Sequence, residues 1–155
     1  MTTVERFASG DDVFGVLNAE PGEASRLRYS LPEFGFAVRE VRGAKMRTVA
    51  ALFDEFAAAF QFPYYFGANK DAFDEVMRDL DEFVGTATGY AVVVRDAEQL
   101  LADQRDQLAW FADAMSFYAD EWSQNRPPVA FKVILHSTDS SYAESAPLGA
   151  VSLTF

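Results

Sequence analysis

The sequence predicts a single α/β domain over residues 1–155, with a small parallel sheet of about three core strands packed against helices. Three largely apolar, strand-length segments carry this prediction: residues 36–41, 90–94 and 129–135. Helical patterns separate them, and buried strands separated by helices pair in parallel through right-handed crossovers. The length of 155 residues suits one domain, and half of the residues are hydrophobic, which is enough for a packed core.

An N-terminal β-hairpin is expected before the first core strand. Residues 12–17 and 26–31 flank a Pro21-Gly22 turn. In the second of these segments Leu27, Tyr29 and Leu31 alternate with polar residues. A period of two is typical of a half-buried strand, so we expect a β extension over residues 1–35.

Three helices are expected between the core strands. Thr48 is a suitable N-cap for a helix to about Phe60, and Asn69 for a second helix to about Phe83. The third helix spans about 103–122 and stops before two prolines. Apolar residues at helical spacing mark the face of each helix that is expected to be buried: Val49, Leu52, Phe53, Phe56 and Phe60; Ala72, Phe73, Val76, Met77 and Leu80; Leu108, Phe111, Met115, Tyr118 and Trp122.

The C-terminal extension, residues 137–155, is expected to be a polar loop to residue 147 and then an edge strand. Val151, Leu153 and Phe155 alternate, which favours that strand. His136, the single histidine, ends the last core strand. A lone histidine there is typically bonded to backbone, whereas a catalytic triad requires a serine and an aspartate placed by the fold.

Charge and composition narrow the classes of function. The formal net charge is −11, so the chain repels nucleic acid and anionic membranes and attracts basic proteins, although negative charge also serves solubility alone. The chain has no cysteine, which excludes disulfides, zinc thiolate sites and cysteine nucleophiles. Neither a signal-peptide pattern nor an apolar run of about 20 residues is present, so we expect a cytoplasmic protein. No glycine-rich phosphate loop is found, and no cofactor is expected.

The stretch 62–75 is the most informative part of the sequence. Pro63 stiffens a loop, Gly67 permits a tight turn and Asn69 begins a helix. Acidic residues then recur at helical spacing opposite the apolar face, and Lys70 is placed to pair with Asp74 four residues on. A solvated acidic face, a general acid–base pair and a metal site at residues 79–82 are the alternatives to a binding surface.

At these residues the chain resembles the barstar-like ribonuclease inhibitor family. The family hallmark is a Pro, aromatics, and then Gly-x-Asn-x-Asp-Ala-hydrophobic. The matching residues are Pro63, Tyr65, Phe66, Gly67, Asn69, Asp71, Ala72 and Phe73. The likeness covers about residues 36–136 with the same order of strands and helices, and it leaves residues 1–35 and 137–155 as extensions.

The resemblance implies an inhibitor that plugs the active site of a basic ribonuclease, and not an enzyme. By position, Asp71 and Glu75 look like the two helix acids that take the place of substrate phosphates. Tyr65 looks like the aromatic residue that packs on the nuclease, and Gly67 and Asn69 shape the contact loop. Asp113 on the later helix is the candidate for a further acid. The resemblance also favours a monomer and implies no metal.

Three positions of the contact surface depart from the family pattern. Lys70 and Asp74 replace larger apolar or aromatic residues, and Lys70 brings positive charge to a surface meant for a basic cleft. Glu75 is one methylene longer than the aspartate of the type protein. A partner other than the type ribonuclease, or a non-inhibitory protein-binding module, is therefore the alternative expectation.

Overall fold

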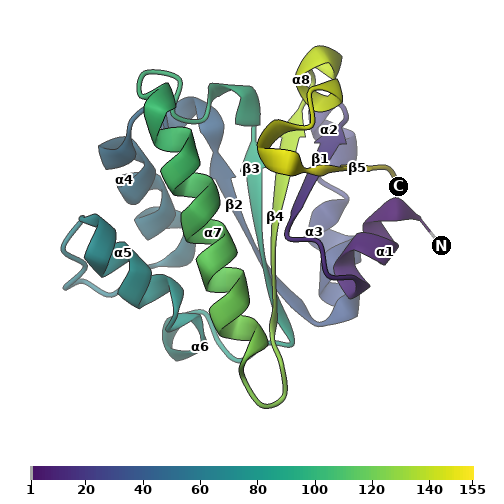
Figure 1. The fold of residues 1–155 in the computed structure, drawn as a ribbon. Coiled ribbons are helices and arrows are strands. Elements are labelled where there is room, and N and C mark those ends of the chain that lie inside the picture. The colour runs from purple at the N-terminus through teal and green to yellow at the C-terminus, as the bar shows by residue number, and fades with distance from the viewer. Residues whose placement is uncertain (1) are drawn as a thin grey trace.

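The computed structural model describes residues 2–155, and Met1 lies outside the described residues. Five parallel strands form one sheet in the order β2-β3-β4-β1-β5, and helices cover both faces (Figure 1). The strands are β1 (Phe14–Asn18), β2 (Phe36–Arg42), β3 (Gly89–Arg95), β4 (Ala130–Ser137) and β5 (Val151–Leu153). The α-helices are α1 (Thr3–Ser9), α2 (Pro21–Ala24), α3 (Leu27–Ser30), α4 (Val49–Phe60), α5 (Lys70–Met77), α6 (Leu80–Phe83), α7 (Leu108–Ser123) and α8 (Ser140–Glu144). Short 3-10 helices are η1 (Leu31–Phe34), η2 (Gly43–Lys45), η3 (Ala97–Gln99), η4 (Arg105–Gln107) and η5 (Pro147–Gly149).

The α/β class, the parallel sheet and the three expected core strands are confirmed, but the sheet has five strands. β3 lies inside the sheet, and its side chains alternate between two hydrophobic cores. Val92 contributes to the core beneath α4, α5 and α7, whereas Val93 contributes to a second core beneath α1, α2 and α3. Burial on both faces explains why this strand is apolar almost throughout.

The expected N-terminal hairpin is wrong. β1 pairs in parallel with β4 on one side and β5 on the other, so it lies within the sheet and not at an edge. The second hairpin strand is instead helical, in α3 and η1. Leu27 and Leu31 are four residues apart and both buried, while Tyr29 between them is 75% exposed. Positions i and i+4 share a face in a helix as well as in a strand, which is why alternation misled the prediction.

Tertiary hydrogen bonds moved two of the expected helix boundaries. The helix predicted to run to Phe83 breaks after Met77, because Trp122 Nε1 donates to the Met77 carbonyl at 3.0 Å, and that carbonyl would otherwise continue the helix. α7 begins five residues later than expected, since Asp103 and Gln104 bond to Arg47 and Val49. The expected loop after β4 contains α8, which Asp139 caps. By contrast, the N-caps Thr48 and Asn69 and the edge strand β5 are confirmed.

Candidate functional site

The contact loop is the loop between α4 and α5, residues 61–69. It presents two tyrosines to solvent, because its other aromatic residues pack against the core. Phe62 packs on Phe60, Phe66, Phe73 and Phe83 at ring-centroid distances of 4.9–6.1 Å. Tyr64 and Tyr65 lie between these anchors and are 105% and 81% exposed. The candidate contact residue Tyr65 is therefore fixed in place by inward-facing neighbours and free at its ring.

The turn that starts α5 is built by Asn69. Its Oδ1 accepts a hydrogen bond from the Ala72 N–H at 2.8 Å, and its Nδ2 donates to the Gly67 carbonyl at 3.4 Å. The left-handed residue of the turn is Ala68, with φ of 51°. An added Cβ at Gly67 would lie 3.3 Å from the Asn69 amide, which is a tight contact. Both predicted residues thus shape the start of the helix.

The inner face of α5 is fixed by aromatic packing. Phe73 is fully buried and packs against Phe53, Phe56, Trp110 and Tyr118 at centroid distances of 5.2–6.1 Å. This anchoring sets the rotation of α5 about its own axis. It therefore decides which residues of the helix face solvent.

Asp71 and Glu75 lie on the outer side of α5 and are both exposed. They are one helical turn apart, a rise of about 6 Å. Within residues 2–155, no hydrogen bond or ion pair engages either carboxylate. The two acids are consequently held by a rigid helix with their charges free.

Lys70 and Asp74 have partners on α7 and its approach, and the pair expected between them does not form. Lys70 Nζ donates to Gln107 Oε1 at 2.8 Å and lies 4.8 Å from the centre of the Trp110 ring. The Tyr118 hydroxyl donates to Asp74 Oδ1. Burial and this hydrogen bond to Asp74 together raise the pKa of Tyr118 well above its ordinary value, so the hydroxyl stays a donor. Both residues therefore bind α5 to α7.

Asp113 is exposed on α7, on the side that lies next to α5. Trp110 and Phe117, three residues before it and four after, face Lys70 and Arg78. The Arg78 guanidinium carbon is 5.7 Å from the centre of the Phe117 ring. The helical spacing places Asp113 between these two contacts, so the structure brings all eight predicted site residues to one region.

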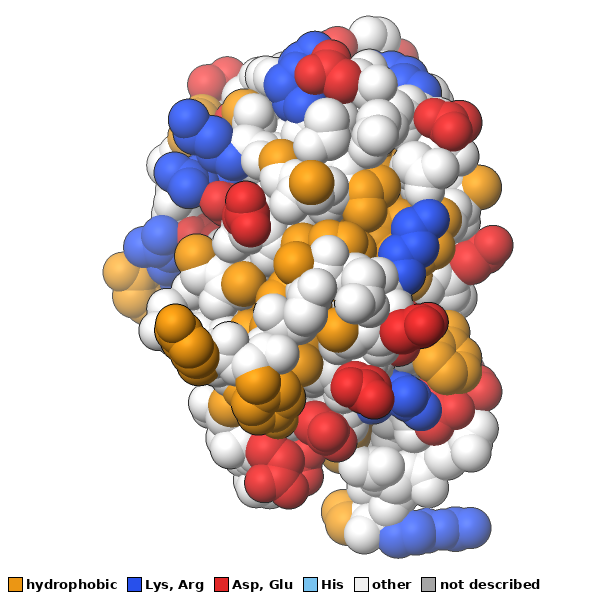
Figure 2. Space-filling model, turned by 90° about the vertical axis from the view of Figure 1, so that its left-hand side faces the viewer, with side chains coloured by type: hydrophobic (Ala, Val, Ile, Leu, Met, Phe, Trp, Pro, Cys, Tyr) orange, Lys and Arg blue, Asp and Glu red, His pale blue; other side chains and the backbone are white. Residues whose placement is uncertain are grey.

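Two further acids, which the prediction did not include among the site residues, extend the acidic side of α5. A hollow of about 640 Å³ lies between the contact loop and the end of α5, and Asp79 and Glu82 line it together with Tyr65 and Glu75. The continued helical spacing of acids beyond Arg78 was the signal in the sequence. Figure 2 shows this side of the molecule, with hydrophobic and acidic side chains close together over α4, α5 and α6.

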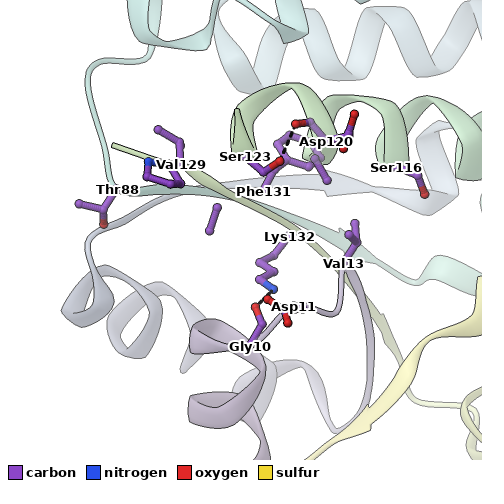
Figure 3. A pocket seen from close by; sticks show the side chains of 13 residues that line it. Gly10, Asp11, Val13, Thr88, Ser116, Asp120, Ser123, Val129, Phe131 and Lys132 are labelled. Atoms are coloured by element: carbon purple, nitrogen blue, oxygen red, sulfur yellow. Dashed lines mark hydrogen bonds between the residues drawn. The ribbon is translucent and has the colours of Figure 1, made fainter. Parts of the chain in front are cut away.

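A second hollow, of about 490 Å³, lies on the other side of α7, between that helix, β4 and the connection from α1 to β1 (Figure 3). Its one cation, Lys132, is buried and donates to the carbonyls of Gly10, at 2.7 Å, and Asp12. Burial lowers the pKa of this lysine. Lys132 thus fastens the N-terminal segment to β4, and the hollow has no counterpart to the exposed aromatics of the contact loop.

His136 has the structural role expected of it. The ring is buried, Nδ1 accepts from the Asp96 N–H at 3.4 Å, and Nε2 lies 2.9 Å from the Ala19 carbonyl. Nε2 therefore carries the proton and donates to that carbonyl.

Among residues 2–155, no three His, Asp or Glu side chains converge in a way that would hold a metal ion. The helices within the described residues are also too short or too polar to cross a bilayer.

Comparison with known proteins identifies both a family and a fold. The family described as Barstar (barnase inhibitor) matches residues 36–136, which include the contact loop, α5 and α7. No curated protein matches the chain. Two solved structures of the ORC2 protein of Aeropyrum pernix, the ADP form and the ADPNP-ADP complexes, resemble it with a TM-score of 0.51 each at 11% and 10% identity. The likeness covers 97% of this chain but only 45% and 44% of theirs, and at such identity it shows the fold alone.

Proposed function

Because this chain belongs to the barstar (barnase inhibitor) family, we propose that it binds and blocks a basic ribonuclease through the contact loop and α5. The carboxylates of Asp71 and Glu75 take the places of substrate phosphates in the nuclease active site. Tyr65 packs on the nuclease, while Gly67 and Asn69 hold the loop that presents it. Asp113 adds a further negative charge from α7.

The observation that carries this proposal is the state of Asp71 and Glu75. Both carboxylates are exposed, lie one turn apart and have no hydrogen-bonding or ionic partner among the described residues. The helix already fixes the backbone of both residues, so a cationic cleft that closes on them has only their side chains to order. The formal net charge of −11 also attracts a basic partner to the protein and speeds association.

The biological setting follows from the chemistry of the partner. A ribonuclease that is active inside the cell that makes it destroys that cell's own RNA. An inhibitor of this kind acts as an immunity protein or antitoxin, and we infer that it works in the cytoplasm, as a monomer until it meets the nuclease. It needs neither metal nor cofactor for this purpose.

A non-inhibitory protein-binding module is the second candidate, and Lys70 favours it. The Lys70 ammonium lies on the contact side, against Trp110 and Gln107, where a basic active site would repel it. Like charges placed across an interface exclude some partners and select others. An enzyme that uses Asp71 and Glu75 as acid and base is less well supported, because both side chains are exposed and Asp71 does not line the hollow that Glu75 lines.

The test is binding to, and inhibition of, purified barnase and of nucleases captured from the source cells. Changing both Asp71→Ala and Glu75→Ala is expected to weaken binding by about 2–8 kcal/mol, the range known for hot spots of protein interfaces, the barnase–barstar complex among them. Calorimetry gives the affinity, and RNA cleavage gives the inhibition. Added salt should slow association of the unmodified protein.

The matched control changes two exposed acids elsewhere, Asp54→Ala and Glu144→Ala, and so removes the same charge. This variant should bind nearly as tightly as the unmodified protein. If the Asp71/Glu75 variant folds and binds nuclease as tightly as the control, the proposed contact face is wrong. A captured partner that lacks nuclease activity and depends on the same two acids would support the second candidate instead.

A further inference from the structure

The hollow beside Tyr65 combines an aromatic wall with several carboxylates. It lies between the contact loop, the outer side of α5 and α6 and measures about 640 Å³. Its apolar lining comes from Pro63, Tyr65, Val76 and Phe83, and its acidic lining from Glu75, Asp79 and Glu82. Tyr65 is 81% exposed, so one face of its ring is open to an incoming group.

The cations nearest to this hollow point away from it. Lys70 lies against Gln107 and Trp110, and Arg78 donates from Nε to the Asp74 carbonyl at 3.1 Å and faces Phe117. Both therefore lie on the side of α5 that meets α7. In the described part of the chain, no ion pair involves a residue of α5 or α6, or Asp79, which lies between these two helices. The hollow thus has negative charge that nothing in the chain itself balances.

The form of the hollow selects among possible cations. Its carboxylates do not converge closely enough to bind a metal ion. A lysine ammonium is a compact, strongly hydrated charge that cannot stack flat on an aromatic wall. A guanidinium is planar, stacks on an aromatic face and presents N–H groups in a fork that matches carboxylates at its edge. The hollow has both the wall and the carboxylates.

We propose that this hollow receives an arginine side chain of the protein partner, stacked on Tyr65 with its N–H groups directed to Glu75, Asp79 and Glu82. The proposal rests on the proposed function in that the partner is a basic protein. It extends the contact surface past the acids that match the family motif, onto Asp79 and α6. It also makes the preceding loop and α6 two walls of one arginine site.

The test is a titration of the whole protein, followed by amide NMR, with the peptide acetyl-Gly-Arg-Gly-amide. Saturable shifts are expected at the residues that line the hollow. The same peptide with citrulline, which keeps the shape without the charge, should give none, and a lysine peptide should bind more weakly. Tyr65→Ala should weaken arginine binding about threefold, the worth of an exposed cation–π contact. Asp79→Asn with Glu82→Gln should weaken it roughly fivefold, as for two exposed charge pairs.

The matched control is Asp54→Asn with Glu144→Gln, which removes the same amount of negative charge and should leave the peptide affinity unchanged. Equal binding of the arginine and citrulline peptides, equal binding of the arginine and lysine peptides, or no loss in the Asp79/Glu82 variant would each overturn the proposal. No nuclease is used, so the proposed function is judged separately. Nuclease inhibition without arginine binding would reject only the arginine site, and arginine binding without nuclease inhibition would reject only the nuclease.

Discussion

Two regions of this molecule differ in how their acidic side chains are paired: the region around β2 and β3, and the helices α5 and α6. Every ion pair among residues 2–155 lies around β2, β3 and the turns next to them, whereas α5 and α6 have acids without cationic partners. The four pairs are Arg28–Glu40, Arg42–Glu55, Arg47–Asp103 and Arg95–Glu40. The comparison teaches that net charge does not locate a binding surface. Acids that form ion pairs and acids that do not should also respond differently to mutation.

Glu55→Ala is expected to have the largest effect on stability, because Glu55 is the ion-paired acid that accepts three hydrogen bonds. It is 8% exposed and accepts hydrogen bonds from the Arg42 backbone N–H, Nε and Nη2 at 2.8–2.9 Å. Its loss leaves an edge-strand N–H without its acceptor and should lower the free energy of unfolding by about 2 kcal/mol. Urea denaturation measures the change, and Asp54→Ala, one position away and exposed, is the control.

The same pair predicts a pH dependence. The hydrogen bond from Arg42 holds the pKa of Glu55 below its usual value. The stabilisation is therefore present above the pKa of the unfolded chain, about 4.3, and is lost as the pH falls through the lower folded value. Glu55→Gln should flatten the fall in stability over that acidic range. An unchanged acid limb in this variant would contradict the account of the pair.

Tyr118→Phe is expected to have an intermediate effect, because it removes the donor to Asp74 and so loosens α5 from α7. Asp74 is half-buried and regains some water, so we expect a loss of about 1 kcal/mol in the free energy of unfolding. Thermal unfolding measures it. Tyr65→Phe is the control, because it removes a hydroxyl from an exposed side chain and should leave stability unchanged. Equal losses of stability in the two variants would contradict the role of the Tyr118–Asp74 hydrogen bond.

Asp79→Asn should have the smallest effect on folding, within about 0.5 kcal/mol, because the side chain is exposed and has no partner in the described chain. Relief of repulsion from neighbouring acids makes slight stabilisation at low salt the expected direction. Denaturation at low and high salt checks this. A loss above about 1 kcal/mol in the free energy of unfolding would show that Asp79 supports the fold, as the ion-paired acids do.

The sequence predicted local features well where the chain itself determines them. Thr48 and Asn69 cap their helices as expected, and Phe73, Met115 and Trp122 are buried on the predicted faces. Errors arose where distant residues intervene. Met77 ends its helix because Trp122 takes its carbonyl, and Lys70 turns to Trp110 and not to Asp74. A spacing of four along a helix cannot reveal that another helix offers a better partner.

The place of β1 in the sheet has a consequence for how the chain is made. Residues 14–18 are synthesised long before their neighbours in the sheet, residues 133–137 and 151–153. The sheet therefore cannot form completely until residue 153 has been synthesised, and such long-range pairing slows folding. Until then Leu17, which is buried in the folded sheet, is exposed to solvent, and exposed apolar surface of this kind favours aggregation.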